Sequence, residues 1–115
     1  MQLTNSLFKI LDYKTTEKGL VATIELDPTH IVYVGHFPGQ PVTPGVVQMQ
    51  IVNELLDHFL ERKMKIKTLA QAKFLNVLNP EEISQMTIHI EQYSKEELIR
   101  LKAWGENSLG TLFKL

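Results

Sequence analysis

The chain has 115 residues, of which 43% are hydrophobic and 22% charged, as in ordinary soluble globular proteins. We expect one domain spanning residues 1–115. Twelve Lys and Arg against thirteen Asp and Glu leave a net charge of -1, which argues against nucleic acid as the main partner. Cysteine is absent, which excludes disulfides and thiolate chemistry and fits a reducing cytoplasm. With neither a signal-peptide pattern nor a membrane-length apolar run, we expect a cytoplasmic protein without membrane contact.

The first predicted elements are two strands. Apolar and polar residues alternate from Leu20 to Leu26, which is the period of a half-buried strand. The stretch from Phe8 to Thr15 alternates more weakly and is the expected hairpin partner across Thr16 to Gly19. The N-terminal part of the chain therefore predicts a β-hairpin.

A long loop and a helix come next. Between Asp27 and Pro44 lie four of the five prolines and two glycines, which predicts a sterically fixed loop. Thr43 followed by Pro44 predicts an N-cap and a first helical position, with the helix continuing to Glu61. Its expected apolar stripe is Met49, Val52, Leu56, Phe59 and Leu60, and its polar face is Gln50, Glu54, Asp57 and Glu61.

The C-terminal half predicts strands. Four basic residues follow the helix, namely Arg62, Lys63, Lys65 and Lys67. We then expect strands over residues 67–74, 85–91, 99–103 and 109–115, with turns at 79–80, 94–96 and 105–108. Two strands, one long helix and about four further strands predict an α+β domain built on an antiparallel sheet.

The loop and helix start carry a motif. From Gly35 to Gln48 the chain reads GHFPGQPVTPGVVQ. The HFPG tetrapeptide, Pro41 and the PGV helix opening resemble, in spacing as well as type, the signature of beta-hydroxyacyl-acyl-carrier-protein dehydratases. PGVVQ is most similar to the short dehydratase-like proteins of aryl-polyene-type pathways. The resemblance is strong from Gly35 to Glu54, and elsewhere it lies in the order of elements. It implies a hotdog fold, an antiparallel sheet wrapped around one long central helix.

The resemblance also implies roles for residues near the motif. His36 would be the general base that removes a proton from the carbon next to the thioester carbonyl, since free imidazole has a pKa of about 6.5. The backbone N–H groups of Gly45 and Val46 would stabilise the charge that develops on the thioester oxygen. Phe37, Val46 and Val47 could line an acyl channel, with core packing as the alternative.

One position departs from the family pattern. The dehydratases carry an acidic residue fourteen positions after the histidine, and this chain has Gln50 there. An amide cannot act as a general acid, and loss of one general acid typically costs about 10² to 10⁴ in rate. Gln50 could still hold the hydroxyl by hydrogen bonds, and Glu54, one turn further, could replace the acid only if the substrate or the helix sits differently.

Three functions fit these features. The first is dehydration of a 3-hydroxyacyl thioester on acyl carrier protein to the trans-2-enoyl thioester, in fatty-acid or polyene-type biosynthesis. The second is a non-catalytic or half-catalytic partner subunit, and the third is an acyl thioesterase, which the HFPG loop disfavours. The family's site is built across two chains, so we expect a homodimer or a heterodimer with a paralogue. The basic residues after the helix would dock the acidic carrier protein.

The remaining candidate residues favour structural roles. We expect no cofactor, because no nucleotide motif is present, and no metal site, because His30 and His36 have no third ligand at suitable spacing. His30, His58 and His89 are interpreted as structural histidines. Trp104 and Tyr93 have no motif around them and are expected to pack.

Overall fold

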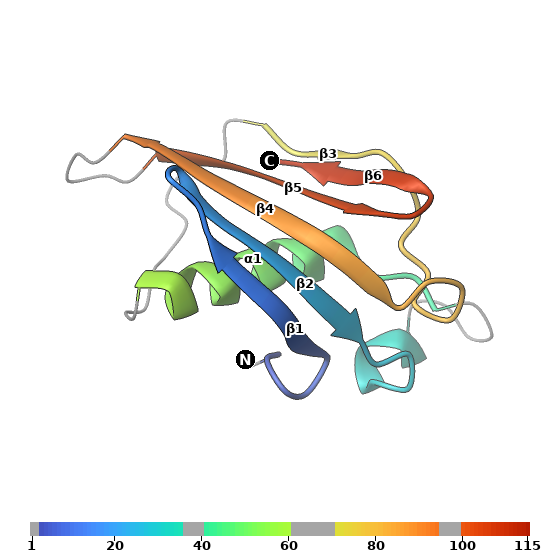
Figure 1. The fold of residues 1–115 in the computed structure, drawn as a ribbon. Helices are drawn as coiled ribbons and strands as arrows, with labels where there is room; N and C mark the ends of the chain where they lie inside the picture. Colours follow the sequence, from blue (N-terminus) through green and yellow to red (C-terminus); the bar gives the residue numbers. More distant parts are fainter. Residues whose placement is uncertain (1–2, 36–40, 61–70, 95–99) are drawn as a thin grey trace.

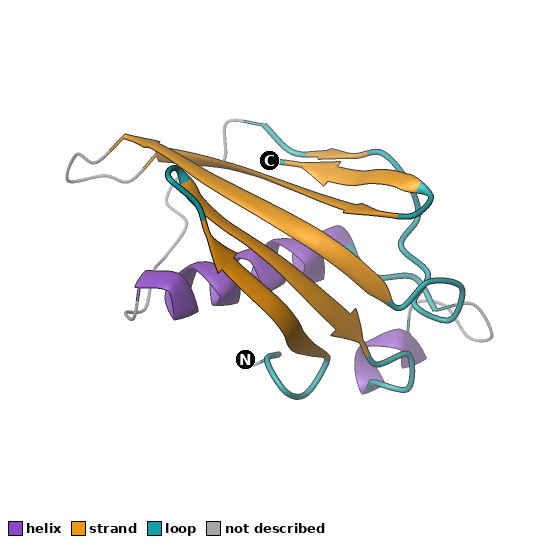
Figure 2. Cartoon of the chain, viewed as in Figure 1, coloured by secondary structure: helices purple, strands orange, loops and turns teal. Residues whose placement is uncertain are grey.

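The computed structural model describes residues 3–35, 41–60, 71–94 and 100–115. It contains one antiparallel sheet with a long helix, α1 (Gly45–Leu60), lying across one face (Figures 1 and 2). The six strands are β1 (Phe8–Thr15), β2 (Gly19–Leu26), β3 (Lys73–Phe74), β4 (Gln85–Ser94), β5 (Arg100–Asn107) and β6 (Gly110–Lys114), and their order in the sheet is β1-β2-β4-β5-β6-β3. This confirms the predicted α+β class.

The alternation read from the sequence places the core between sheet and helix. In β2 the side chains of Leu20, Ala22, Ile24 and Leu26 are buried, and in β4 so are those of Met86, Ile88 and Ile90. The two strands pair antiparallel, with Ala22 opposite Ile88. Since side chains alternate between faces, one face of each strand packs against α1 and the other carries residues such as Thr87 and Glu91.

Helix α1 begins one residue later than predicted. The carbonyl of Pro44 accepts hydrogen bonds from the Val47 and Gln48 N–H groups, so Pro44 closes the first turn from outside the helix. Thr43 was expected to cap the helix, but its hydroxyl instead shares a hydrogen bond with the Tyr33 hydroxyl. The cap prediction was wrong because a tertiary contact took the threonine side chain.

The buried face of α1 also differs from the predicted stripe. Ile51 and Leu55 are fully buried, whereas Leu56 and Phe59 are only partly buried at its margin. Glu54, expected on the polar face, is 8% exposed because its carboxylate has partners in the N-terminal segment. A helical period fixes relative directions, but the face that meets the sheet depends on the fold.

Two predictions in the C-terminal half need correction. β5 continues through Gly105 to Asn107, so the predicted turn at 105–108 was wrong and the turn lies at Ser108 and Leu109. A Cβ at Gly105 would come within 2.4 Å of the Phe113 ring and 2.9 Å of the Met86 methyl, so glycine here makes room for core packing. Of the strand expected over 67–74, residues 67–70 lie outside the described part and β3 comprises Lys73–Phe74.

A short 3-10 helix, η1 (Ile31–Val34), lies in the stretch expected to be irregular. No helix in the described ranges is both long and apolar enough to cross a membrane.

Candidate active site

The predicted site residues fall into two groups. His36, Phe37 and the basic residues Arg62, Lys63, Lys65 and Lys67 lie outside the described residues. Gly45, Val46, Val47, Gln50 and Glu54 all lie on α1, in its first ten residues. The helix therefore brings together the described part of the predicted site.

The segment that carries His36 is tied together at its two described ends. The hydroxyl groups of Tyr33, in η1, and Thr43, before α1, share a buried hydrogen bond of 2.9 Å. Thr43 is 2% exposed, and its N–H donates to the Leu78 carbonyl at 2.9 Å. Burial raises the pKa of Tyr33, so this phenol stays protonated at neutral pH. The contact holds η1 against the start of α1.

The start of α1 offers backbone donors. Within the described chain, the N–H groups of Gly45 and Val46 make no backbone hydrogen bond, as expected for the first turn of a helix. These are the two N–H groups predicted to stabilise the thioester oxygen. The helix dipole adds a partial positive charge at the same place. The position is chemically suited to a developing negative charge.

The residues at the start of α1 differ in packing and exposure. A Cβ on Gly45 would come within 2.8 Å of the Phe74 ring, so a side chain at this position would have to displace that partly exposed ring of β3. Val46 is 75% exposed, whereas Val47 is 7% exposed and belongs to the core. Core packing is therefore the role that the structure gives Val47, and Val46 faces outward.

Gln50 and Glu54 form a hydrogen-bonded pair one helical turn apart. The Gln50 Nε2 group donates to Glu54 Oε2 at 3.0 Å. Both oxygens of Glu54 also accept from the N-terminal segment: the Leu3 N–H lies 2.9 Å from each, while the Thr4 N–H and hydroxyl lie 2.8 and 2.7 Å from Oε1. The contact joins residues more than fifty positions apart, so no local sequence pattern predicted it.

The protonation state of Glu54 follows from these contacts. Burial by itself raises the pKa of Glu54, but the hydrogen bonds from Thr4, Gln50 and Leu3 together outweigh it and hold the pKa below the ordinary value. Each of these donors favours the carboxylate over the acid. A carboxylate that is ionised and surrounded by donors is a poor source of a proton at neutral pH.

Gln48 was missed by the sequence analysis. This side chain is 4% exposed, and its Nε2 group donates to the Thr43 carbonyl at 3.0 Å. Its Oε1 atom is buried and accepts no hydrogen bond among the described residues. Gln48 thus reinforces the junction between the loop and α1. Its place in the PGVVQ motif was the available signal.

The other histidines have local contacts, in line with their structural interpretation. His30 caps η1, accepting from the Val32 N–H at 3.0 Å, and His58 packs edge-on against Tyr13. His89 stacks on Trp104 with ring centroids 4.8 Å apart. No group of three potential metal ligands occurs within the described ranges.

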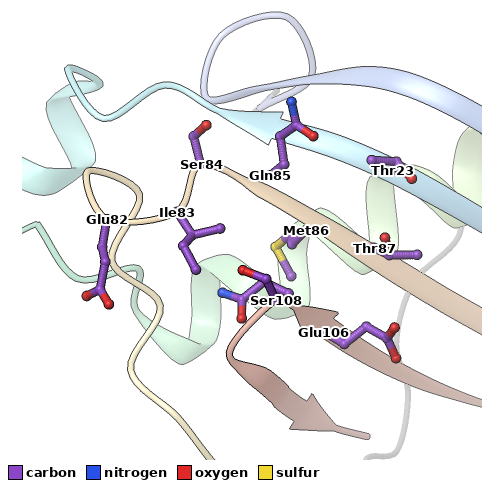
Figure 3. A pocket seen from close by; sticks show the side chains of 10 residues that line it. Thr23, Glu82, Ile83, Ser84, Gln85, Met86, Thr87, Glu106 and Ser108 are labelled. Atoms are coloured by element: carbon purple, nitrogen blue, oxygen red, sulfur yellow. The ribbon is translucent and has the colours of Figure 1, made fainter.

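A separate open hollow of about 580 Å³ lies at one end of β4 and β5 (Figure 3). Its lining includes the polar residues Thr23, Gln85, Thr87 and Glu106, which alternate along their strands with core positions. None of its lining residues belongs to the predicted site. The hollow is therefore not the place where the described site residues meet.

The family model of the ApeI-like proteins, described as ApeI dehydratase, matches residues 12–108. The chain belongs to the ApeI-like dehydratase family. This confirms the resemblance to dehydratases of aryl-polyene-type pathways, and the match includes the whole motif from Gly35 to Gln48 as well as Gln50 and Glu54.

One curated protein and one solved structure are also similar to this chain. The 3-hydroxyacyl-[acyl-carrier-protein] dehydratase FabZ of Clostridium acetobutylicum is 27% identical over 66 residues, which span 51% of this chain and 47% of that enzyme. The solved dehydratase heterocomplex ApeI:P from Xenorhabdus doucetiae superposes with a TM-score of 0.76 at 23% identity, covering 92% of this chain and 91% of the other. The structural match confirms the hotdog fold.

Proposed function

We propose that this ApeI-like protein dehydrates a 3-hydroxyacyl thioester, carried on acyl carrier protein, to the trans-2-enoyl thioester. One observation supports the proposal: the described end of the motif, from Pro41 to Gln48, lies at a helix start where the N–H groups of Gly45 and Val46 have no backbone acceptor among the described residues. The Tyr33–Thr43 hydrogen bond ties the segment that carries His36 to the same helix start. The described residues on the two sides of the segment that carries His36 are thereby joined.

The proposed reaction needs one proton-carrying group. His36 takes the proton from the carbon next to the thioester carbonyl, and the N–H groups of Gly45 and Val46 stabilise the charge on the carbonyl oxygen. The bond between C3 and its hydroxyl then breaks, and the His36 imidazolium returns the proton to the hydroxyl, which leaves as water. Gln50 binds the hydroxyl group. This scheme avoids a second acid, which an amide at 50 and an ionised Glu54 cannot provide.

The proposal extends to the oligomeric state of the protein and to the residues that bind the carrier protein. We propose that the active form is a dimer, in keeping with the ApeI:P heterocomplex whose fold this chain shares. Arg62, Lys63, Lys65 and Lys67 would bind the acidic carrier protein, and Phe37 would contact the acyl chain.

Replacing the proposed base tests the function. His36→Ala should lower dehydration of a 3-hydroxyacyl thioester by at least about 10² fold, since general-base catalysis contributes 10² to 10⁴. The change should be measured with purified, folded protein by following enoyl thioester formation. His58→Ala is the matched control, because His58 is exposed and packs edge-on against Tyr13, and it should keep near-wild-type turnover. Full activity in folded His36→Ala would remove His36 from the mechanism.

A second candidate function is that of a partner subunit. It is favoured by Gln50, which replaces the family's acid, and by the heterocomplex that shares this fold. In that case the purified chain alone would be nearly inactive, and adding a dehydratase paralogue would restore turnover. Release of free thiol from a saturated acyl thioester would instead indicate the thioesterase alternative.

A further inference from the structure

The hydrogen bond between Gln50 and Glu54 fixes the orientation of the Gln50 amide. An ionised carboxylate only accepts hydrogen bonds, and a primary amide donates through nitrogen and accepts through oxygen. Gln50 must therefore turn its nitrogen toward Glu54, as the 3.0 Å contact shows. Its carbonyl oxygen is then directed away from Glu54.

Glu54 is itself fixed in place. Its Oε1 atom accepts from the N–H and hydroxyl of Thr4, and the Leu3 N–H lies 2.9 Å from both oxygens. All of these partners are donors, and an ionised carboxylate can accept from them on both of its oxygens. The N-terminal segment thus anchors a carboxylate that in turn orients Gln50.

We infer that Glu54 is a positioning residue that makes Gln50 meet the substrate with its carbonyl oxygen. This rests on the proposed function, in which Gln50 binds the group on C3. A carbonyl oxygen has two lone pairs, so it can accept from a substrate hydroxyl alongside another partner.

The orientation of the Gln50 amide would distinguish substrates by the group that they carry on C3. A 3-hydroxyacyl thioester offers a hydrogen-bond donor on C3, whereas a 3-oxoacyl thioester offers only an acceptor. An acceptor facing an acceptor leaves both groups unsatisfied, and sites that bind a hydroxyl discriminate strongly against partners that lack it. Glu54 therefore makes the site prefer hydroxyl over ketone on C3.

The affinities of a matched pair of ligands test whether Glu54 sets this preference. The probes are pantetheine thioesters of 2,2-dimethyl-3-hydroxy and 2,2-dimethyl-3-oxo acids, which cannot be dehydrated because C2 carries no hydrogen. By calorimetry the wild type should bind the hydroxy probe about tenfold more tightly or better. Glu54→Gln should reduce this ratio by about fivefold or more, since an amide at 54 can face either end of Gln50. An unchanged ratio in folded Glu54→Gln would overturn the inference.

Two further variants separate positioning from a purely structural effect. Thr4→Val removes the hydroxyl donor to Oε1 but keeps the Leu3 and Thr4 N–H donors to Glu54 and the contact between Gln50 and Oε2, so Glu54 stays in place and the ratio should not change. In a Gln50→Met background, Glu54→Gln should have no further effect on the ratio. A change of the ratio in Thr4→Val as large as that in Glu54→Gln would indicate general loosening and contradict the inference.

The orientation of the Gln50 amide can also be tested without substrate. In NMR spectra the side-chain NH₂ protons of Gln50 should exchange slowly in the wild type and in Thr4→Val, and fast in Glu54→Gln. Equal exchange in wild type and Glu54→Gln would overturn the orienting role whatever the substrate is. If neither probe binds the wild type while Gln50 is protected as expected, the proposed function fails and the orientation of the amide stands.

Discussion

In the proposed mechanism, the residue at position 50 binds the hydroxyl group that leaves from C3. A carboxyl group introduced there would lie beside the Glu54 carboxylate, where Gln50 Nε2 now lies 3.0 Å from Oε2. Two carboxyl groups so close cannot both ionise, so one proton is shared between them. Because Glu54 is held by donors from Leu3 and Thr4, the proton belongs on the new acid, on the side that faces Glu54.

We therefore expect Gln50→Glu to leave the dehydration rate unchanged or to reduce it. The proton of the new acid would be directed to Glu54, and its carbonyl oxygen would face the substrate as the Gln50 oxygen does. The measurement is kcat for a 3-hydroxyacyl thioester with purified homomeric protein. A gain of about tenfold or more, with a nearly inactive wild type, would show instead that the homomeric site lacks a general acid.

Glu54 also predicts an acid-sensitive N-terminal segment. Its pKa is lowered in the folded protein, so its stabilising contribution is complete above the ordinary glutamate value of about 4.3 and is lost as the pH falls below it. We expect the Leu3 and Thr4 N–H groups to lose protection from hydrogen exchange in that acid range. Exchange measured by NMR should show this pH dependence in the wild type and not in Glu54→Gln. Protection independent of pH in the wild type would contradict it.

At the scale of elements, η1 and α1 are joined by one buried pair of hydroxyl groups. Tyr33→Phe would leave the Thr43 hydroxyl, 2% exposed, without this partner. We expect a loss of about 1–3 kcal/mol in the free energy of unfolding and a lower kcat/KM, because the segment that carries His36 is less well tied.

A double variant tests whether the two hydroxyl groups stabilise the protein through the hydrogen bond between them. Removing both hydroxyl groups in Tyr33→Phe with Thr43→Val should cost less than the sum of the single changes, because no unpaired polar group remains. Denaturant unfolding gives the stabilities. Tyr13→Phe is the control, since Tyr13 lies in β1 and packs edge-on against His58. Additive single effects would mean that the two hydroxyl groups act independently.

The elements themselves were largely readable from the sequence, for a physical reason. Burial on one face of a strand imposes a period of two, and β2 and β4 follow it closely. The errors arose where a distant contact overrides local preference. Gly105 is a residue typical of turns but lies inside β5, where the Phe113 ring fills the space that a side chain would take. Thr43 has the chemistry of a cap but bonds to Tyr33.

The site was readable only in part. The motif predicted which residues gather at the start of α1, since sequence neighbours on a helix stay neighbours. The partners of Glu54 were not predictable, because Leu3 and Thr4 reach it through the fold and carry no local signal. Val47 was equally ambiguous, since an apolar residue near a helix start fits a channel or a core, and the described packing places it in the core.

At the scale of the whole molecule, several exposed apolar side chains belong to segments that contact one another near the start of α1. Three described contacts converge there: Tyr33 with Thr43, the Thr43 N–H with Leu78, and Gly45 with Phe74. Next to these contacts lie exposed apolar residues, namely Ile31, Val34, Val46, Phe74 and Val77. β3, which carries Phe74, forms an edge of the sheet (Figure 1). Exposed apolar surface next to a strand edge is typical of an association surface.

We therefore expect this surface to form the dimer contact that the proposed function requires. Sedimentation at micromolar concentration should give twice the chain mass of 13.2 kDa. Val77→Asp, at a side chain 70% exposed in the single chain, should weaken dimerisation by about tenfold or more, because a charge buried in an apolar contact is costly. Leu11→Asp is the matched control, since Leu11 is 48% exposed on β1 at the opposite edge of the sheet.

The oligomeric state also separates the proposed functions. A wild-type protein that sediments only as a monomer would count heavily against a site completed by a second identical chain. Dimerisation only after a paralogue is added would favour the partner-subunit function. Loss of the dimer in Leu11→Asp but not in Val77→Asp would move the contact to the other edge.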